Sequence, residues 1–308
     1  MKRPARSLQR VTPQQLRAFE AVARLASVTR AAEEMHVTQP TVSVQLRELA
    51  RAVGEPLLQV SGRRIRLTQA GETLQRTAGE ITACWLRFES SIAEINGLLR
   101  GRLRVAAVTT AEYFVPDFVG PFAAQHPGIG IELAIENRDR VVERLNRAED
   151  DLAIMMLPPA GLAVESVPIL DNPLVVIAHA QHRLAGRRVR LAQLGGERWL
   201  MREPGSGTRL VAEQHFAEAG FLPNVAMSLG SNEAIKHAVA AGLGVAVVSR
   251  LAVDSSLAPR NRKGIGIAVL DVARFPIRRS WSVVWRGDRP QTLAARRFVE
   301  YLAASRKG

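Results

Sequence analysis

The chain has 308 residues, which is enough for two or three domains with cores of their own. Its 42 Lys and Arg residues exceed its 29 Asp and Glu residues, and the net charge of +13 favours a polyanionic partner. A single cysteine excludes an internal disulfide framework, no apolar run is long enough to span a bilayer, and no signal peptide is recognisable, so we expect a cytoplasmic protein.

Basic residues are concentrated at the start of the chain. Residues 1–66 hold 12 basic and 5 acidic side chains, a net charge of +7. Such a basic segment attracts phosphate groups and is typical of nucleic-acid-binding domains. Double-stranded DNA is therefore the expected macromolecular partner.

Three short helices are predicted in this basic segment. The first begins at Thr12, which can cap it, followed by Pro13 in the first turn and by Gln15, which completes a capping box. The second is expected near Ser27–Met35, and the third runs from Thr38 to Val53 and is closed by Gly54. The short turn between the last two is typical of a helix-turn-helix.

The third helix is the expected DNA-reading element. Apolar residues at spacings of 4, 3 and 4 predict a buried face formed by Val42, Leu46, Leu49 and Val53. Small polar groups and arginines on the opposite edge suit a major groove, although each alone could be an ordinary solvated residue. The residues of these helices expected at the DNA are Ser27, Thr29, Arg30, Thr38, Gln39, Pro40, Thr41, Ser43, Val44 and Arg47.

A short hairpin is expected after the third helix. Leu57-Leu58 and Ile65-Arg66-Leu67 form two short strands around the turn Ser61-Gly62-Arg63-Arg64. An arginine-tipped hairpin beside a helix-turn-helix indicates a wing that follows phosphates or enters a minor groove, although alone it would more often be a solvated turn. Arg63 and Arg64 are therefore expected DNA contacts.

A long helix is predicted from Thr68, and its apolar residues recur at alternating spacings of 4 and 3. This heptad pattern is typical of helices that pair with each other. Packing on the chain's own core is the alternative, but paired helices would place two DNA-reading heads on a two-fold site. The expected dimerisation residues are Leu74, Ala78, Ile81, Trp85, Phe88, Ile92 and Ile95.

Strands and helices alternate through the last two hundred residues. Between residues 102 and 157 the order strand–helix–strand–helix–strand predicts a parallel sheet covered on both faces. A second set follows between residues 174 and 249, with a strand expected at Leu191–Leu194. Strands near Ile265–Leu270 and Trp281–Trp285 and a final helix from Leu293 complete two α/β lobes with a cleft between them.

The predicted fold class is therefore α+β, with three parts. Residues 1–67 form a winged helix-turn-helix, 68–100 a linker and dimerisation helix, and 101–308 an effector-binding domain. Lobe one of that domain covers about 101–172 and 275–308, and lobe two covers about 173–274.

Three segments place hydroxyl groups and free backbone N–H groups directly after predicted strands. Ligands in such sheets bind beyond the carboxyl ends of strands, at helix starts that suit a small anion. Each segment could instead be an ordinary helix cap, and we expect all three to converge on one cleft. The expected effector-binding residues are Thr109, Thr110, Ala111, Met155, Gly205, Ser206, Gly207, Thr208, Ser231 and Asn232.

The N-terminal segment resembles that of LysR-type transcription regulators. The resemblance lies in Ser27-Val28-Thr29-Arg30-Ala31-Ala32, in Val37-Thr38-Gln39-Pro40-Thr41-Val42-Ser43 and in Leu67-Thr68-Gln69-Ala70-Gly71-Glu72. It implies a winged helix-turn-helix, a dimerising linker helix and an effector domain like type 2 periplasmic binding proteins. It also implies dimers of dimers that bend promoter DNA, with a metabolite changing the bend.

The C-terminal part is most similar to regulators of Calvin-cycle operons, which implies phosphorylated sugars or related metabolites as effectors. The similarity includes Tyr113-Phe114-Val115-Pro116, Arg202 to Arg209 and Ser231 to Lys236. Glu112 stands where that branch usually has Lys, and Met156-Leu157 stands where it has Gly-Arg. The loss of two cations disfavours a multiply charged phosphate ligand.

The DNA-binding part departs from the usual family residues at three positions, which bear on the operator sequence that the protein recognises. Leu58 replaces the usual Phe, Val60 the usual Arg, and Val44 stands where many members have Arg. They leave the mode of binding unchanged.

Two other classes of protein fit the sequence less well. An enzyme is disfavoured because the sequence has no nucleophile elbow, P-loop, zinc-binding His-Glu pair or clustered carboxylates, so neither a cofactor nor a metal is expected. A transport-type binding protein would share the two lobes but lack the helix-turn-helix. The sequence predicts a regulator whose partners are DNA, a small effector and further copies of itself.

Overall fold

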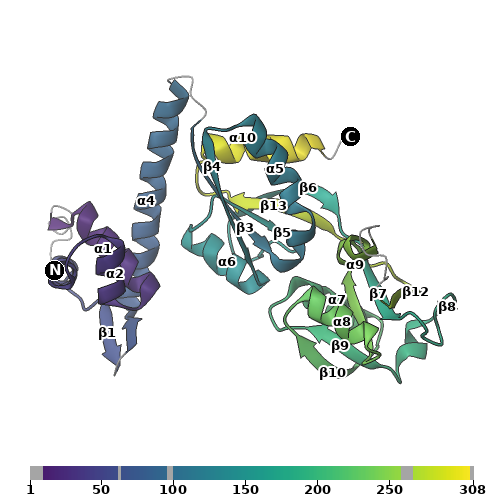
Figure 1. The fold of residues 1–308 in the computed structure, drawn as a ribbon. Coiled ribbons are helices and arrows are strands. Elements are labelled where there is room, and N and C mark those ends of the chain that lie inside the picture. Colours follow the sequence, from purple (N-terminus) through teal and green to yellow (C-terminus); the bar gives the residue numbers. More distant parts are fainter. Residues whose placement is uncertain (1–9, 62–63, 96–99, 258–265, 306–308) are drawn as a thin grey trace. The chain divides into compact units, whose positions relative to one another are not determined.

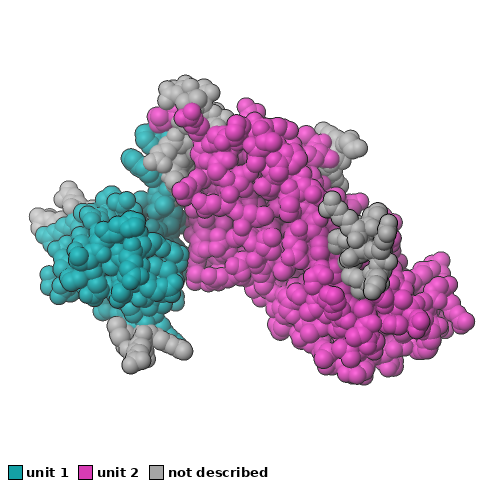
Figure 2. Space-filling view, viewed as in Figure 1, with its two compact units in different colours: residues 1–88 teal, residues 89–308 magenta. Residues whose placement is uncertain are grey.

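The computed structural model describes residues 10–61, 64–95, 100–257 and 266–305. The chain divides into two compact units, residues 1–88 and 89–308, which Figure 2 shows in different colours. No described helix is long and apolar enough to cross a membrane.

The first unit contains a three-helix core, a hairpin and most of a long helix (Figure 1). The two strands of the hairpin pair antiparallel, with Leu58 opposite Leu67. The elements are α1 (Pro13–Leu25), α2 (Val28–Glu34), α3 (Gln39–Val53), β1 (Leu58–Ser61), β2 (Arg64–Leu67) and α4 (Gln69–Ile95).

The helix ends of the first unit follow from capping chemistry. Thr12 and Gln15 form the predicted capping box at α1, and Thr38 accepts a hydrogen bond from the Thr41 amide at α3. Gly54 closes α3 at φ +85°, a left-handed conformation that favours glycine. The predicted helix starts and the predicted glycine cap are confirmed.

The core of the first unit is built from the facing sides of α1, α2 and α3 and from the start of α4. Phe19, Val42 and Leu49 are almost completely buried there. Leu46 is half-buried, whereas Val53 is 38% exposed, so the prediction that Val53 is buried is wrong. Val53 is the last residue of its helix, and the chain turns away at Gly54 before anything packs over it.

Lobe one of the second unit is built on a five-stranded sheet in the order β4-β3-β5-β13-β6. The predicted parallel pairing of β3 with β4 and β5 is confirmed, and β13 adds antiparallel to β5. Its elements are β3 (Gly101–Val108), the 3-10 turn η3 (Thr109–Tyr113), α5 (Val115–Gln125), β4 (Ile129–Glu136), α6 (Arg138–Arg147), β5 (Leu152–Met155), β6 (Val164–Asp171), β13 (Ser280–Arg286) and α10 (Leu293–Ser305).

Lobe two contains a six-stranded sheet in the order β10-β9-β11-β7-β12-β8. The chain enters this sheet after β6 and returns to the lobe-one sheet at β13. Its elements are β7 (Leu174–His179), β8 (Arg188–Val189), η4 (Leu191–Leu194), β9 (Arg198–Arg202), α7 (Gly207–Glu218), β10 (Asn224–Leu229), α8 (Asn232–Ala240), β11 (Val245–Ser249), α9 (Arg250–Leu257) and β12 (Ile267–Val272).

Several features of the second unit differ from the sequence prediction, and the short elements β8 and α9 were not predicted. Leu191–Leu194 is a 3-10 turn rather than a strand, because its two leucines are buried three residues apart on one side of a tight turn. The edge strand Val164–Asp171 was missed because it is mostly exposed and contains Pro168, which weakens the strand pattern.

Candidate DNA interface and effector cleft

The outward edge of α3 is open to solvent, as predicted. Pro40 and Arg47 are exposed, and Val44 is 40% exposed. The Gln39 side-chain amide donates a hydrogen bond to the Ser43 hydroxyl at 3.0 Å, which holds both groups on this edge. A row of amide, hydroxyl and guanidinium groups on one accessible helix edge can reach the base edges of a major groove.

The remaining predicted DNA contacts surround the start of α3. The Thr38 and Thr41 hydroxyls lie 2.8 Å apart, and the Ser27 hydroxyl accepts a hydrogen bond from the Arg30 amide at 3.3 Å. Thr29 and Arg30 are exposed on α2. Of the predicted wing arginines, Arg63 lies outside the described residues, and only the backbone of Arg64, in β2, is described.

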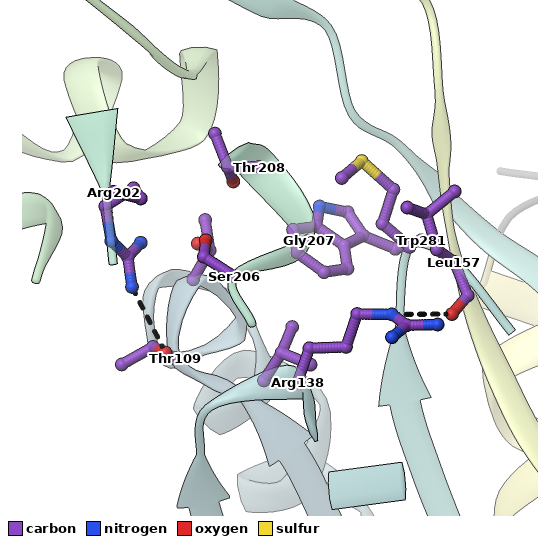
Figure 3. A pocket seen from close by; sticks show the side chains of 11 residues that line it. Thr109, Arg138, Leu157, Arg202, Ser206, Gly207, Thr208 and Trp281 are labelled. Carbon is purple, nitrogen blue, oxygen red and sulfur yellow. Dashed lines mark hydrogen bonds between the residues drawn. The ribbon is translucent and has the colours of Figure 1, made fainter. Parts of the chain in front are cut away.

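A narrow cleft lies where the two lobes of the second unit meet (Figure 3). Its empty volume is about 310 Å³, and the enclosed part has room for about one water molecule. None of its described lining residues is Asp or Glu. The lining residues are Val108, Thr109, Thr110, Arg138, Met156, Leu157 and Trp281 from lobe one, with Arg202, Ser206, Gly207 and Thr208 from lobe two.

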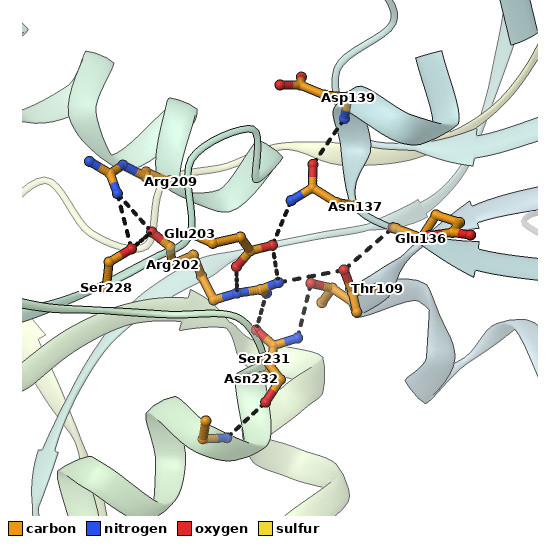
Figure 4. A network of polar contacts seen from close by, with 12 residues as sticks. Thr109, Glu136, Asn137, Asp139, Arg202, Glu203, Arg209, Ser228, Ser231 and Asn232 are labelled. Carbon is orange, nitrogen blue, oxygen red and sulfur yellow. Dashed lines mark hydrogen bonds and ion pairs between the residues drawn. The ribbon is translucent and has the colours of Figure 1, made fainter. Parts of the chain in front are cut away.

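Arg202 ties the two lobes together at one side of this cleft (Figure 4). It is 2% exposed and forms a two-point ion pair with Glu203, at 2.7 and 2.9 Å. Its remaining donors reach the Asn232 side-chain oxygen at 2.8 Å and the Thr109 hydroxyl at 3.5 Å. Asn232 in turn donates to the Thr110 hydroxyl at 3.1 Å. Arg202 therefore already has its charge neutralised.

Comparison with known proteins identifies both parts of the chain. Residues 13–72 match the bacterial regulatory helix-turn-helix of the lysR family, and residues 96–307 match the LysR substrate binding domain. The chain belongs to the LysR family. This LysR-type transcription regulator is similar to a RuBisCO operon transcriptional regulator of Acidithiobacillus ferrooxidans, with 41% identity over 97% of this chain and 96% of that protein. The predicted likeness to Calvin-cycle operon regulators is thus confirmed.

Two solved structures extend the comparison. The regulatory domain of CcmR from Synechocystis PCC6803, in complex with 2-PG, is 38% identical, with a TM-score of 0.63 over 67% of this chain and 98% of that one. Full-length CbnR in complex with its target DNA is 26% identical, with a TM-score of 0.66 over 96% of this chain and 99% of that one. The relatives are named as regulators, which confirms the prediction that the protein is not an enzyme.

Most of the predicted effector residues of this LysR-type regulator lie at the cleft or bond to a residue that lines it. Thr109, Thr110, Ser206, Gly207 and Thr208 line the cleft. The three segments predicted to converge therefore do meet, because Asn232 of the third segment bonds to Thr110.

The other predicted effector residues lie beside or below the cleft. Ser231 caps α8, and Gly205 contacts the rim formed by Asn137 and Asp139. Ala111 and Met155 are completely buried in the lobe-one core, so neither can touch a ligand in this conformation. Met155 falls on the inner side of β5 because side chains alternate along a strand, and the next residue, Met156, reaches the cleft instead.

Six lining residues were not predicted, and three of them carry side-chain hydrogen-bond donors: Arg138, Arg202 and Trp281. Arg138 begins α6 directly after β4 and donates to the Leu157 carbonyl oxygen at 3.2 Å. The rule that ligands bind beyond strand ends would have found it. Arg202 ends β9 and was covered by the same rule, whereas no local signal marks Trp281 on β13.

A second tie between the lobes involves a buried lysine. Lys236 of α8 is 1% exposed, pairs with Glu233 at 2.6 Å and donates to the Ala252 carbonyl oxygen at 2.9 Å. Tyr113 of lobe one donates to Glu233 at 2.6 Å. Desolvation raises the pKa of Glu233, but the hydrogen bonds from Lys236 and Tyr113 outweigh it, so the pKa falls below its usual value.

The heptad seam of α4 divides into two parts. Ala78 is buried and Leu74 half-buried against α1 and α3, so these two serve the chain's own core rather than a dimer. Further along, the seam faces solvent, and Ile95's side chain lies outside the described residues. The exposed seam residues are Ile81, Trp85, Phe88 and Ile92.

Proposed function

We propose that this regulator binds promoter DNA as a dimer, with the edge of α3 in the major groove, and that a small anion in the cleft alters that binding. The observation that carries the first half is the accessible polar edge from Gln39 to Arg47 on a helix whose other side is buried. The solved complex of CbnR with its target DNA supports it.

Dimerisation is proposed to occur through the exposed half of the α4 seam. Four large apolar side chains at heptad spacing would otherwise remain in water, and a second copy of the same seam buries them. Two such dimers would combine on one promoter and bend it, as the family resemblance implies.

The chemistry of the cleft supports a small anionic effector. Its lining offers hydroxyl, guanidinium, indole and backbone N–H donors and no carboxylate. Glu203 neutralises Arg202 with a short two-point ion pair, whereas Arg138 has a longer ion pair, at 3.5 Å, with the exposed Asp139. We therefore assign to Arg138 the positive charge that a ligand can use. One available cation fits an anion that places a single phosphate or carboxylate group beside Arg138. The structure of the CcmR regulatory domain in complex with 2-PG supports an effector of this kind.

The experiment is fluorescence anisotropy with a duplex from the promoter nearest the gene and a scrambled duplex of equal length. The full-length protein should prefer the promoter, and its affinity should fall steeply as salt rises from 50 to 200 mM, since phosphate contacts release counterions. Gln39→Ala should lose most of the preference, by about 1–3 kcal/mol, because the amide pairs with adenine. Gln14→Ala, an exposed glutamine of α1, is the matched control.

Adding 2-phosphoglycolate, which carries one phosphate and one carboxylate, tests the second half of the proposal. The affinity for the promoter or the bend angle should change when the cleft is occupied. Equal binding of both duplexes by the wild-type protein would refute the DNA assignment, whereas no response to any phosphorylated or carboxylated metabolite would refute the anionic effector.

A further inference from the structure

Trp281 carries a hydrogen-bond donor with no acceptor in the described part of the chain. It lies on β13 in lobe one, is 1% exposed, and packs on Phe114 with ring centroids 5.2 Å apart. Its indole nitrogen is buried and bonds to no described group. Buried tryptophans normally satisfy this donor, as Trp199 does through the Leu194 carbonyl oxygen at 3.3 Å.

This donor belongs to the lining of the cleft. Figure 3 shows the indole ring among the lining side chains, with its nitrogen on the side away from Arg138 and toward Thr208 in that view. The lobes approach closely here, since a Cβ on Gly207 would lie 3.4 Å from Arg138 Cδ and 3.7 Å from Met156 Cε. An acceptor placed in this gap would lie between the two lobes, next to the Trp281 ring.

Lobe two presents further free donors at the same place. Ser206 and Thr208 are 6% and 5% exposed, and neither hydroxyl bonds to another group of the described residues. They stand at the start of α7, a 12-residue helix whose first backbone N–H groups point out of its N-terminus. The partial positive charge of a helix N-terminus favours an anion.

We infer that the Trp281 indole N–H donates a hydrogen bond to an oxygen of the bound anion, whose other oxygens accept from Ser206, Thr208 and the start of α7. The inference rests on the proposed anionic effector and assigns its orientation. Lobe one supplies a neutral donor in addition to Arg138, and lobe two supplies hydroxyl and backbone donors. Trp281 thus selects a ligand that presents an oxygen acceptor toward lobe one and rejects an apolar or amine group there.

Calorimetric titration of the full-length protein with 2-phosphoglycolate and with inorganic phosphate tests this assignment. Trp281→Phe keeps an aromatic ring against Phe114 but removes the donor, so binding should weaken at least about tenfold, as expected for a hydrogen bond to a charged acceptor. Trp285 lies on the same strand but is not among the residues that line the cleft. Trp285→Phe is therefore the matched control, and its affinity for 2-phosphoglycolate should stay within about twofold of the wild type.

A spectroscopic measurement on the unmutated chain gives an independent result. In deuterated protein with 15N-labelled indoles, the Trp281 N–H proton should move downfield when ligand is added, whereas the Trp199 proton should not. If Trp281→Phe does not fold, the three other Trp→Phe variants each identify one indole resonance, and the remaining resonance belongs to Trp281.

The outcomes separate the two proposals. Equal affinity of Trp281→Phe and wild type, or an unmoved Trp281 resonance at saturation, overturns the role of Trp281 and leaves the anionic effector standing. If the wild-type protein binds neither these two probes nor any other phosphorylated or carboxylated metabolite, the anionic effector class and this inference are both overturned.

Discussion

Replacing Ile81 with Asp tests the surface on which dimerisation is proposed to depend. Ile81 is 48% exposed in the single chain and begins the exposed part of the α4 seam. Complete burial of such a side chain is worth about 1.5–3 kcal/mol, so its exposed half contributes roughly 0.7–1.5 kcal/mol per copy. Because a two-fold interface contains Ile81 from both copies, the dimer loses this contribution twice.

The loss from burial alone is therefore about 1.5–3 kcal/mol for Ile81→Asp, and desolvation of two carboxylates adds to it. At 1.4 kcal/mol for each tenfold change, the dissociation constant of the dimer should rise about 10- to 150-fold, or more. Sedimentation equilibrium over a dilution series measures this constant directly.

Arg76→Asp is the control for Ile81→Asp, because Arg76 is exposed on α4 away from the seam. It should leave the mass unchanged at every concentration. If Ile81→Asp also sediments as the wild type throughout the series, the exposed seam is not the dimer interface and the proposed arrangement of two DNA-reading heads fails.

Two further substitutions test the ties between the lobes. Gly205 has φ +81°, and a Cβ there would lie 2.5 Å from Asp139 Oδ2. Gly205→Ala should therefore lower the free energy of unfolding by about 1–2 kcal/mol through backbone strain, and the close contact with Asp139 should lower it more. Gly220→Ala, at φ +61° with nothing within 4 Å of its Cβ, should show only the loss from backbone strain in thermal denaturation. Because the pKa of Glu233 is lowered in the folded state, its contribution to stability is present above pH 4.5 and lost as the pH falls through the folded value. Glu233→Gln should therefore flatten the acid limb of a plot of melting temperature against pH, and an unchanged limb would exclude this ion pair as a source of stability.

The first unit could be predicted closely from the sequence because its signals are local. Thr12, Thr38 and Gly54 lie at helix ends where capping chemistry depends on residues only a few positions away. The misplacement of Val53 has the same origin, since periodicity gives the face of a helix but does not show where the packing partner ends.

The cleft could be predicted only in part. Its hydroxyl groups follow strands, so the rule for parallel sheets brought Thr110, Ser206 and Asn232 into one region. Trp281 arrives from β13, more than a hundred residues beyond β5, and its place depends on the antiparallel addition of that strand to the lobe-one sheet. The free indole donor is a property of the packed structure, because it depends on every neighbour that fails to accept its hydrogen bond.

The ties between the lobes determine what an effector can change. Arg202 reaches Thr109, Asn232 reaches Thr110, and Tyr113 reaches Glu233, so hydrogen bonds join the lobes across the cleft. A ligand shifts a conformational equilibrium only by its difference in affinity for the two states. An anion that enters beside these residues must compete for the threonine hydroxyls that now hold Arg202 and Asn232. We therefore expect the effector to break these hydrogen bonds between the lobes and to replace them with its own. The cleft would then rearrange from a closed conformation instead of closing from an open one.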